Sequence, residues 1–192
     1  MKRRVHSIVI HHSAGLQTDT AESINRRHLL RGWLGIGYHR VVRKNASTGL
    51  WEVQAGRDIE KKGAHAGRGF PGNLGSVGYV VCGHYVETEP PKEALVALYK
   101  DIRALVREVG ALYVWGHCDL NATACPGQKL YNWIPLLRYG IVGGVDPANL
   151  FDAWGSQSDR ALAVDRGVAR QAFRDNKQWA KGKGERHGAG TD

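Results

Sequence analysis

Side chains that could bind a metal ion occur at three places in the sequence. His11 and His12 end a run of β-branched residues. His117 and Cys118 follow a second short apolar run, and Cys125 comes eight residues after His117. Two imidazoles and one thiolate form a good zinc ligand set, and three protein ligands leave a fourth position for water. Zinc lowers the pKa of bound water to about 7, so the pattern indicates metal-assisted hydrolysis, although each piece alone is weak evidence.

The elements that must position these residues alternate between strand and helix. Runs of strand type cover residues 5–12, 37–43, 51–54, 77–82 and 112–115. Helices are expected over residues 20–31, 92–109 and 128–138. This alternation predicts an α/β domain with a mixed central β-sheet and helices on its faces. The ends of neighbouring strands are where such a sheet brings together residues that lie far apart in the chain.

Two of the helices have clear signals. Asp19 and Glu22 match a capping box with Asp19 as the N-cap, and Gly32 ends the helix that follows. The helix after Pro90 carries apolar residues three and four positions apart, which we interpret as a core-facing stripe: Leu95, Leu98, Ile102, Leu105 and Val109. Residues 56–75 are rich in glycine and charge and are expected to form an irregular loop.

Composition limits the class of protein. The chain has 192 residues with 42% apolar and 23% charged side chains, which is typical of a globular protein. No apolar run approaches the roughly 20 residues that cross a bilayer, so a transmembrane protein is excluded, and the N-terminus does not predict a secretory signal. Three cysteines are an odd number and argue against a disulfide scaffold. We expect one domain over residues 1–144 and a C-terminal extension over 145–192, partly helical with a mobile end.

The net charge of +9 is unevenly distributed. Residues 1–145 hold 19 basic and 11 acidic side chains, whereas residues 146–192 hold 8 and 7. A basic domain is attracted to polyanions, which include nucleic acid, anionic lipid headgroups and the anionic polymers of a bacterial envelope. The sequence has no RNA-binding aromatic motif, helix-turn-helix signature or run of basic residues, so a nucleic-acid partner is not expected.

Taken in order, five motifs resemble one enzyme family: IVIHHSAG, GWLGIGYH, GAHAG, NLGSVG and HCDLNATACPG. They are similar to the zinc-dependent N-acetylmuramoyl-L-alanine amidases of type 2, which include phage lysozymes of the T7 type and peptidoglycan recognition proteins. The resemblance covers about residues 5–140. It implies one zinc ion, bacterial peptidoglycan as the partner, and hydrolysis of the bond between N-acetylmuramic acid and L-alanine.

The resemblance also implies roles for individual residues. The zinc ligands fall on His11, His117 and Cys125, with His12 as a neighbour that does not bind the metal. The tyrosine of GYH, Tyr38, takes the family's catalytic position. It would donate a hydrogen bond to the oxygen that becomes negatively charged, or help to move a proton.

Three further positions carry over from the motifs. Thr123 lies two residues before the cysteine, where T7-type lysozymes have a lysine, so it offers a hydroxyl without a positive charge. GAHAG places His65 in the substrate groove, and NLGSVG places Asn73 near its wall. The remaining histidines and cysteines of interest are interpreted as structural: His12, His39, His84, Cys82 and Cys118.

Three other functions stay open from the sequence. A peptidoglycan recognition protein without catalysis is one, but such receptors typically lack the cysteine ligand, which is present here as Cys125. A lysozyme with an added polymerase-regulating role is another. The third is a cytosolic amidase that recycles wall fragments; such enzymes typically have aspartate at the third ligand position, so Cys125 counts against this alternative. A wall-cutting activity without a signal peptide favours a phage endolysin, which stays in the host cytoplasm until lysis and then acts on the cell wall.

Overall fold

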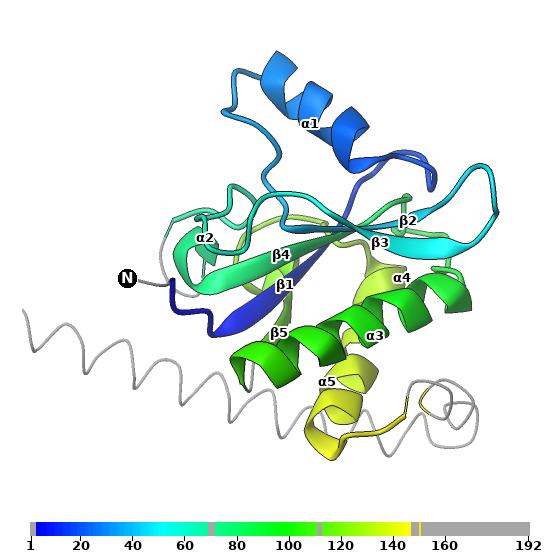
Figure 1. The fold of residues 1–192 in the computed structure, drawn as a ribbon. Coiled ribbons are helices and arrows are strands. Elements are labelled where there is room, and N and C mark those ends of the chain that lie inside the picture. The colour runs from blue at the N-terminus through cyan, green and yellow to red at the C-terminus, as the bar shows by residue number, and fades with distance from the viewer. Residues whose placement is uncertain (1–2, 69–71, 111–112, 147–149, 151–192) are drawn as a thin grey trace, which may run out of the picture.

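The computed structural model describes residues 3–68, 72–110, 113–146 and Leu150 (Figure 1). Eleven elements are described within these residues. In chain order they are β1 (Ser7–His12), α1 (Ala21–Leu30), β2 (Arg40–Lys44), β3 (Trp51–Ala55), α2 (Gly72–Gly75), β4 (Ser76–Val81), α3 (Lys92–Val109), β5 (Tyr113–Gly116), the 3-10 helix η1 (His117–Asp119), α4 (Gln128–Tyr131) and α5 (Ile134–Gly143).

The strands form one five-stranded sheet in the order β3-β2-β4-β1-β5. β2 and β3 are antiparallel, whereas β4 pairs in parallel with β2, and β1 pairs in parallel with both β4 and β5. β1 therefore lies between two parallel neighbours, and its first five residues are buried. The predicted α/β fold with a mixed sheet is confirmed.

Helices cover both faces of the sheet (Figure 1). The predicted stripe of α3 packs into the main core, where Leu98 and Ile102 are fully buried with Ile8 and Ile10 of β1. Only its last member, Val109, is 39% exposed, because it lies at the end of the helix. On the opposite face, α1 contributes its one buried aliphatic side chain, Ile24, to a smaller cluster with Val41, Val80 and Cys82.

Strand alternation decides which face each side chain of β1 reaches. Successive residues of a strand point to opposite faces. Ile8 and Ile10 pack in the main core under α3, whereas Val9 packs in a separate cluster with Ala66 and Trp115. His11 shares the face of Val9 and is buried.

The N-cap of α1 differs from the prediction. Thr20, not Asp19, is the N-cap: its side chain accepts a hydrogen bond from the Ser23 N–H at 3.0 Å, and the Ser23 hydroxyl accepts from the Thr20 N–H at 2.9 Å. The Asp19 carboxylate is instead bound by both terminal nitrogens of Arg27 at 2.9 and 2.8 Å. A carboxylate engaged in a bidentate ion pair does not cap the helix, so the interpretation of Asp19 was wrong.

The helix predicted over residues 128–138 is divided into α4 and α5. Pro135 explains the division, because proline has no backbone N–H to donate to the carbonyl of Tyr131, four residues earlier. Proline is tolerated in the first turn of a helix, and α5 accordingly begins at Ile134. The loop predicted over residues 56–75 is irregular where it is described, except for the short helix α2.

The first residues of the predicted extension contact the domain. The Tyr99 hydroxyl and the Arg103 guanidinium each donate a hydrogen bond of 2.8 Å to the carbonyl of Val145, and Leu150 is buried in the main core. The rest of the extension, with the partly helical segment and the mobile end that the sequence predicts, lies outside the described residues.

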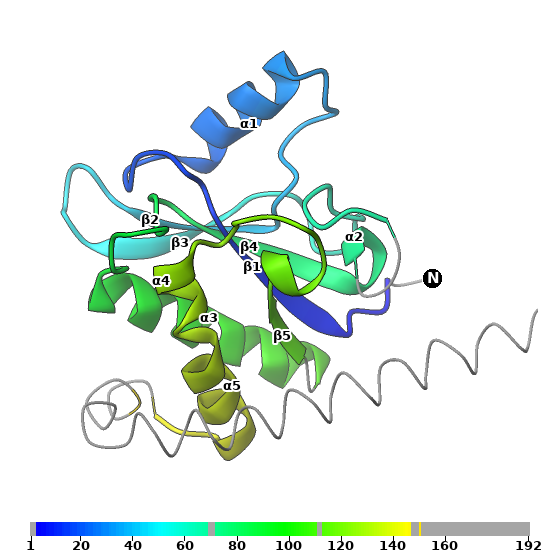
Figure 2. The same cartoon turned by 180° about the vertical axis from the view of Figure 1, so that it is seen from behind.

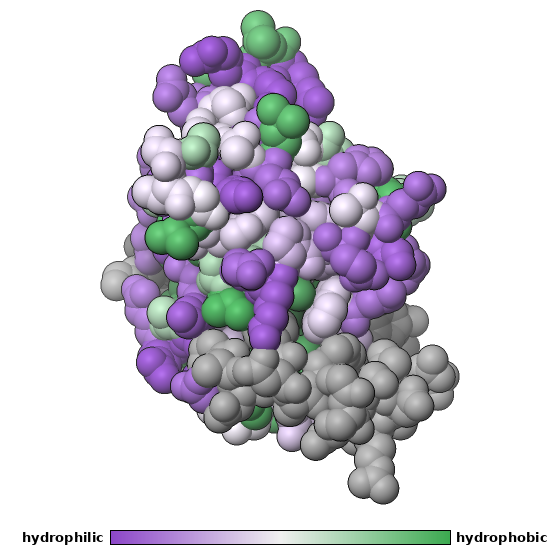
Figure 3. Space-filling model, turned by 90° about the vertical axis from the view of Figure 1, so that its right-hand side faces the viewer, coloured by the Kyte–Doolittle hydropathy of each residue, from purple (hydrophilic) through white to green (hydrophobic). Residues whose placement is uncertain are grey.

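The described surface is mostly hydrophilic on the face that Figure 3 presents, with apolar side chains scattered over it. Large exposed apolar side chains are most concentrated at the end of α1 and just after it: Leu29, Leu30, Trp33 and Leu34. No helix in the described part of the chain is long and apolar enough to span a membrane.

Candidate metal centre

Sheet register brings two of the predicted ligands together. Ile10 of β1 is paired with Gly116 of β5, so the next residues along these parallel strands, His11 and His117, lie side by side. Their ring centroids are 4.5 Å apart. Asp119 holds the turn that carries His117, because its carboxylate accepts hydrogen bonds from the Gly116 N–H at 2.9 Å and the Tyr131 hydroxyl at 2.6 Å.

The third predicted ligand comes from the segment between η1 and α4, which passes over the sheet (Figure 2). The Cys125 Sγ lies 3.6 Å from Nδ1 of His11. One nitrogen or sulfur atom from each of His11, His117 and Cys125 lies within 4.8 Å of the others. Within the described ranges this is the one group of three or more histidine, cysteine or acidic side chains placed to hold a metal ion.

The neighbouring histidine and cysteine lie outside this group. The His12 ring stacks on His84 with centroids 5.4 Å apart, and its Nδ1 accepts a hydrogen bond from the Tyr85 N–H. Cys118 is exposed to solvent. The alternation of β1 thus separates His11 from His12, as the family motif implies.

The electrostatics of the three residues suit a metal ion. Burial lowers the pKa of His11 well below its usual value and also lowers the pKa of His117, so both imidazoles are neutral and offer a lone pair at pH 7. Burial raises the pKa of the Cys125 thiol to about 12, so metal binding must displace a proton from sulfur. Two neutral imidazoles and one displaceable thiol proton are a donor set that fits zinc.

Tyr38 lies beside this group, in the segment just before β2. Its ring centroid is 5.1 Å from that of His11 and 5.5 Å from that of His28 of α1. Burial raises the pKa of the Tyr38 phenol above its usual value, so the hydroxyl keeps its proton at neutral pH. The hydroxyl has no hydrogen-bond partner among the described residues, which leaves its proton available as a donor.

The other predicted site residues take different positions. Thr123 is exposed, and its hydroxyl accepts a hydrogen bond of 3.2 Å from the Cys125 N–H. His65 is buried, and its Nδ1 lies 3.0 Å from Nε2 of His11. The Asn73 side-chain oxygen accepts hydrogen bonds from the backbone N–H groups of His65 and Ala66 at 2.6 and 2.8 Å, so it orders this segment.

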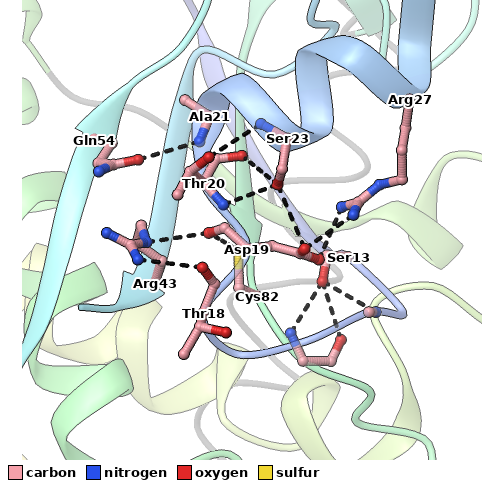
Figure 4. A network of polar contacts seen from close by, with 12 residues as sticks. Ser13, Thr18, Asp19, Thr20, Ala21, Ser23, Arg27, Arg43, Gln54 and Cys82 are labelled. Atoms are coloured by element: carbon pink, nitrogen blue, oxygen red, sulfur yellow. Dashed lines mark hydrogen bonds and ion pairs between the residues drawn. The ribbon is translucent and has the colours of Figure 1, made fainter. Parts of the chain in front are cut away.

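A polar network fixes the chain between His12 and α1 (Figure 4). Arg43 of β2 donates hydrogen bonds to the carbonyls of Asp19 and Thr18, and the Asp19 carboxylate binds Arg27 of α1. The Ser13 hydroxyl accepts from the Gly83 N–H at 3.0 Å. The sequence analysis did not predict this network or the role of Asp119. For Asp19, its position just before a predicted helix was a visible signal that the residue has a structural role.

These features define an α/β protein with a candidate metal centre of two histidines and one cysteine, at the edge where its parallel strands end. Comparison with known proteins agrees with this class. Residues 1–128 match the Amidase_2 family, described as N-acetylmuramoyl-L-alanine amidase. The chain therefore belongs to the N-acetylmuramoyl-L-alanine amidase family of type 2, which the sequence motifs resemble.

Three similar proteins illustrate the range of relatives. The endolysin of Klebsiella phage KP32 is 29% identical over 139 residues, covering 69% of this chain and 87% of the endolysin. Peptidoglycan-recognition protein SD of Drosophila melanogaster is 35% identical over 99 residues, covering 50% of this chain; the match spans 49% of that protein, about half of its length. The solved structure of the amidase LysC from Clostridium intestinale has a TM-score of 0.57 at 29% identity, covering 66% of this chain and 78% of LysC.

Proposed function

We propose that this protein is a zinc-dependent amidase that hydrolyses the bond between N-acetylmuramic acid and L-alanine in bacterial peptidoglycan. The observation that carries the proposal is the convergence of His11, His117 and Cys125, whose donor atoms lie within 4.8 Å of one another. Membership of the amidase family supports the choice of reaction. The presence of Cys125 favours an enzyme over a receptor that binds peptidoglycan without cutting it.

His11, His117 and Cys125 would hold the zinc ion. When bound, zinc supplies a Lewis acid that polarises the amide carbonyl and makes water a better nucleophile at neutral pH. In the reaction a carbon–oxygen bond to water forms, the carbon–nitrogen bond breaks, and the nitrogen leaves with an added proton. The protein must therefore stabilise negative charge on the carbonyl oxygen while these bonds change.

Tyr38 is placed to provide that stabilisation. Its phenol is protonated and lies beside His11, so it can donate a hydrogen bond to the carbonyl oxygen as charge develops. Thr123 contributes a neutral hydroxyl. Because its oxygen already accepts from the Cys125 N–H, its own proton remains available for a substrate oxygen.

We further propose that the amidase acts as a phage lysis enzyme on the cell wall of its host. The support is the likeness to the Klebsiella phage KP32 endolysin, of which the chain covers 87%. Antibacterial lysis would follow from loss of cross-linked peptide stems from the glycan strands.

The test is to incubate the purified, zinc-loaded protein with peptidoglycan and to identify the products by mass spectrometry. New L-alanine amino termini are expected, and they should be absent with the His11→Ala variant. His12→Ala is the matched control, because its side chain lies outside the metal group, and it should retain activity. Protein that sediments with peptidoglycan but releases no new amino termini would identify a binding module and refute the proposal.

A further inference from the structure

The two ring nitrogens of His11 face different partners. Nδ1 lies 3.6 Å from the Cys125 Sγ, and Nε2 lies 3.0 Å from Nδ1 of His65. Both rings are buried, with His11 1% and His65 8% exposed. His11 therefore has one edge toward the candidate metal site and the other against a second imidazole.

This arrangement restricts the position of the His11 proton. A neutral imidazole carries one N–H, and the nitrogen that binds a metal must present its lone pair. If Nδ1 binds the metal, the proton resides on Nε2 and needs an acceptor in this buried place. Among the described residues, His65 Nδ1 is the atom at hydrogen-bond distance. Metal-binding histidines commonly donate their second N–H to a carboxylate, carbonyl or water. Here the atom within reach is a ring nitrogen of another histidine.

The surroundings of His65 are built to hold its ring in place. Asn73 fixes the backbone by accepting from the His65 N–H. The ring lies against two glycines: a Cβ added to Gly78 of β4 would approach it to 2.6 Å, and one added to Gly63 would approach it to 2.5 Å. Real Cβ atoms do not come this close, so the ring needs both glycines in order to occupy its position.

A second histidine, His39, also contacts the His65 ring. The His39 ring is nearly perpendicular to that of His65, with centroids 5.5 Å apart. Its Nδ1 accepts from the Gly78 N–H at 2.9 Å, so its proton is on Nε2, 3.0 Å from the carbonyl of Lys61. Both ring nitrogens of His39 thus contact backbone groups, which hold its ring in place beside His65.

We infer that His65 is a positioning residue for the metal ligand: it accepts the hydrogen bond from His11 Nε2–H and thereby keeps His11 Nδ1 free of a proton and directed toward Cys125. This inference rests on the proposed zinc centre. This role differs from the substrate-contacting role expected from the GAHAG motif, and it is argued from the buried contact of the His65 ring with His11. Asn73 acts one step further out, by holding the backbone of His65.

The test uses the full chain and three variants, with zinc affinity measured by competition with a chelator. His65→Leu removes the acceptor at similar size, and we expect it to weaken zinc binding by about 10- to 100-fold. His65→Asn places an oxygen near the position of Nδ1 and should restore most of the affinity. His84→Leu is the matched control, because His84 contacts His12 and not the metal group, and its affinity should equal that of the wild type. The cobalt-substituted proteins should show the same order in their visible absorption spectra.

Two outcomes with the variants would overturn the inference. One is wild-type zinc affinity in His65→Leu, and the other is an equal loss in His65→Leu and His65→Asn, which would indicate a general packing defect. A measurement on the wild type avoids any variant that does not fold: nitrogen NMR of the zinc-loaded protein should show His11 protonated at Nε2, and protonation at Nδ1 would also refute the inference. Wild-type protein that binds no zinc would instead refute the proposed function.

Discussion

Tyr38→Phe is the substitution that separates catalysis from structure most cleanly. It keeps the ring that packs beside His11 and His28 and removes only the hydroxyl, which has no hydrogen-bond partner among the described residues. We therefore expect zinc affinity and thermal stability to stay at wild-type values. Removal of one donor to the developing oxyanion typically lowers kcat by about 10²- to 10³-fold, or about 2.7–4 kcal/mol of transition-state stabilisation.

The assay follows the release of L-alanine amino termini from a small muramyl peptide at pH 7 under saturating substrate. Tyr139→Phe is the control, because Tyr139 is half exposed on α5, and kcat should not change. Since the raised pKa keeps the phenol protonated, loss of activity at alkaline pH in the wild type should not follow the usual titration of tyrosine near pH 10. A Tyr38→Phe enzyme with wild-type kcat would refute the catalytic role.

Three further predictions concern the metal, the polar network and the core. Removing zinc with a chelator should lower Tm and abolish activity. In calorimetry, His11→Ala should lose the zinc-dependent rise in Tm, whereas His12→Ala should keep it. Equal losses in the two variants would mean that the wrong histidine was chosen. Asp19→Ala should lower the free energy of unfolding, measured in urea, by about 1–2 kcal/mol, because Asp19 is buried while its partner Arg27 is partly exposed. Glu22→Ala is the control: its ion pair with Arg26 is exposed, so the free energy of unfolding should change by less than about 0.5 kcal/mol. Leu98→Ala, at a fully buried position under the sheet, should lower it by about 2–5 kcal/mol, and a smaller loss would show that this core can collapse around the gap.

Sequence patterns predicted most of the scaffold because its elements depend on local signals. The stripe from Leu95 to Leu105 and the β-branched run of β1 both reflect the periodicity of an element with one or two buried faces. The error at Asp19 arose because its carboxylate binds Arg27, eight residues later in α1, while the neighbouring Thr20 caps the helix. Pro135 was a visible local signal for the division of the last predicted helix.

The sequence could predict which three side chains converge at the candidate metal site, but not all of the contacts around them. The family motifs indicated His11, His117 and Cys125, and the structure brings these three residues together. The contact between His65 and His11 depends on where β4 lies beside β1 and on the space that Gly78 leaves, and no spacing in the sequence encodes that arrangement. A hint in the sequence was that the motif histidine His65 is flanked only by glycine and alanine in GAHAG.

The candidate metal site draws its ligands from parts of the chain that can change independently. His11 lies in β1 and His117 directly follows β5, and these two strands pair along their backbones, whereas Cys125 belongs to a connecting loop. A substitution at position 125 would remove one of the three proposed metal ligands and leave the backbone pairing of the strands unchanged. A single substitution in this loop would thus be enough to turn a hydrolase with this fold into a receptor. The backbone pairing of the sheet, which positions the other site residues, does not involve the Cys125 thiol.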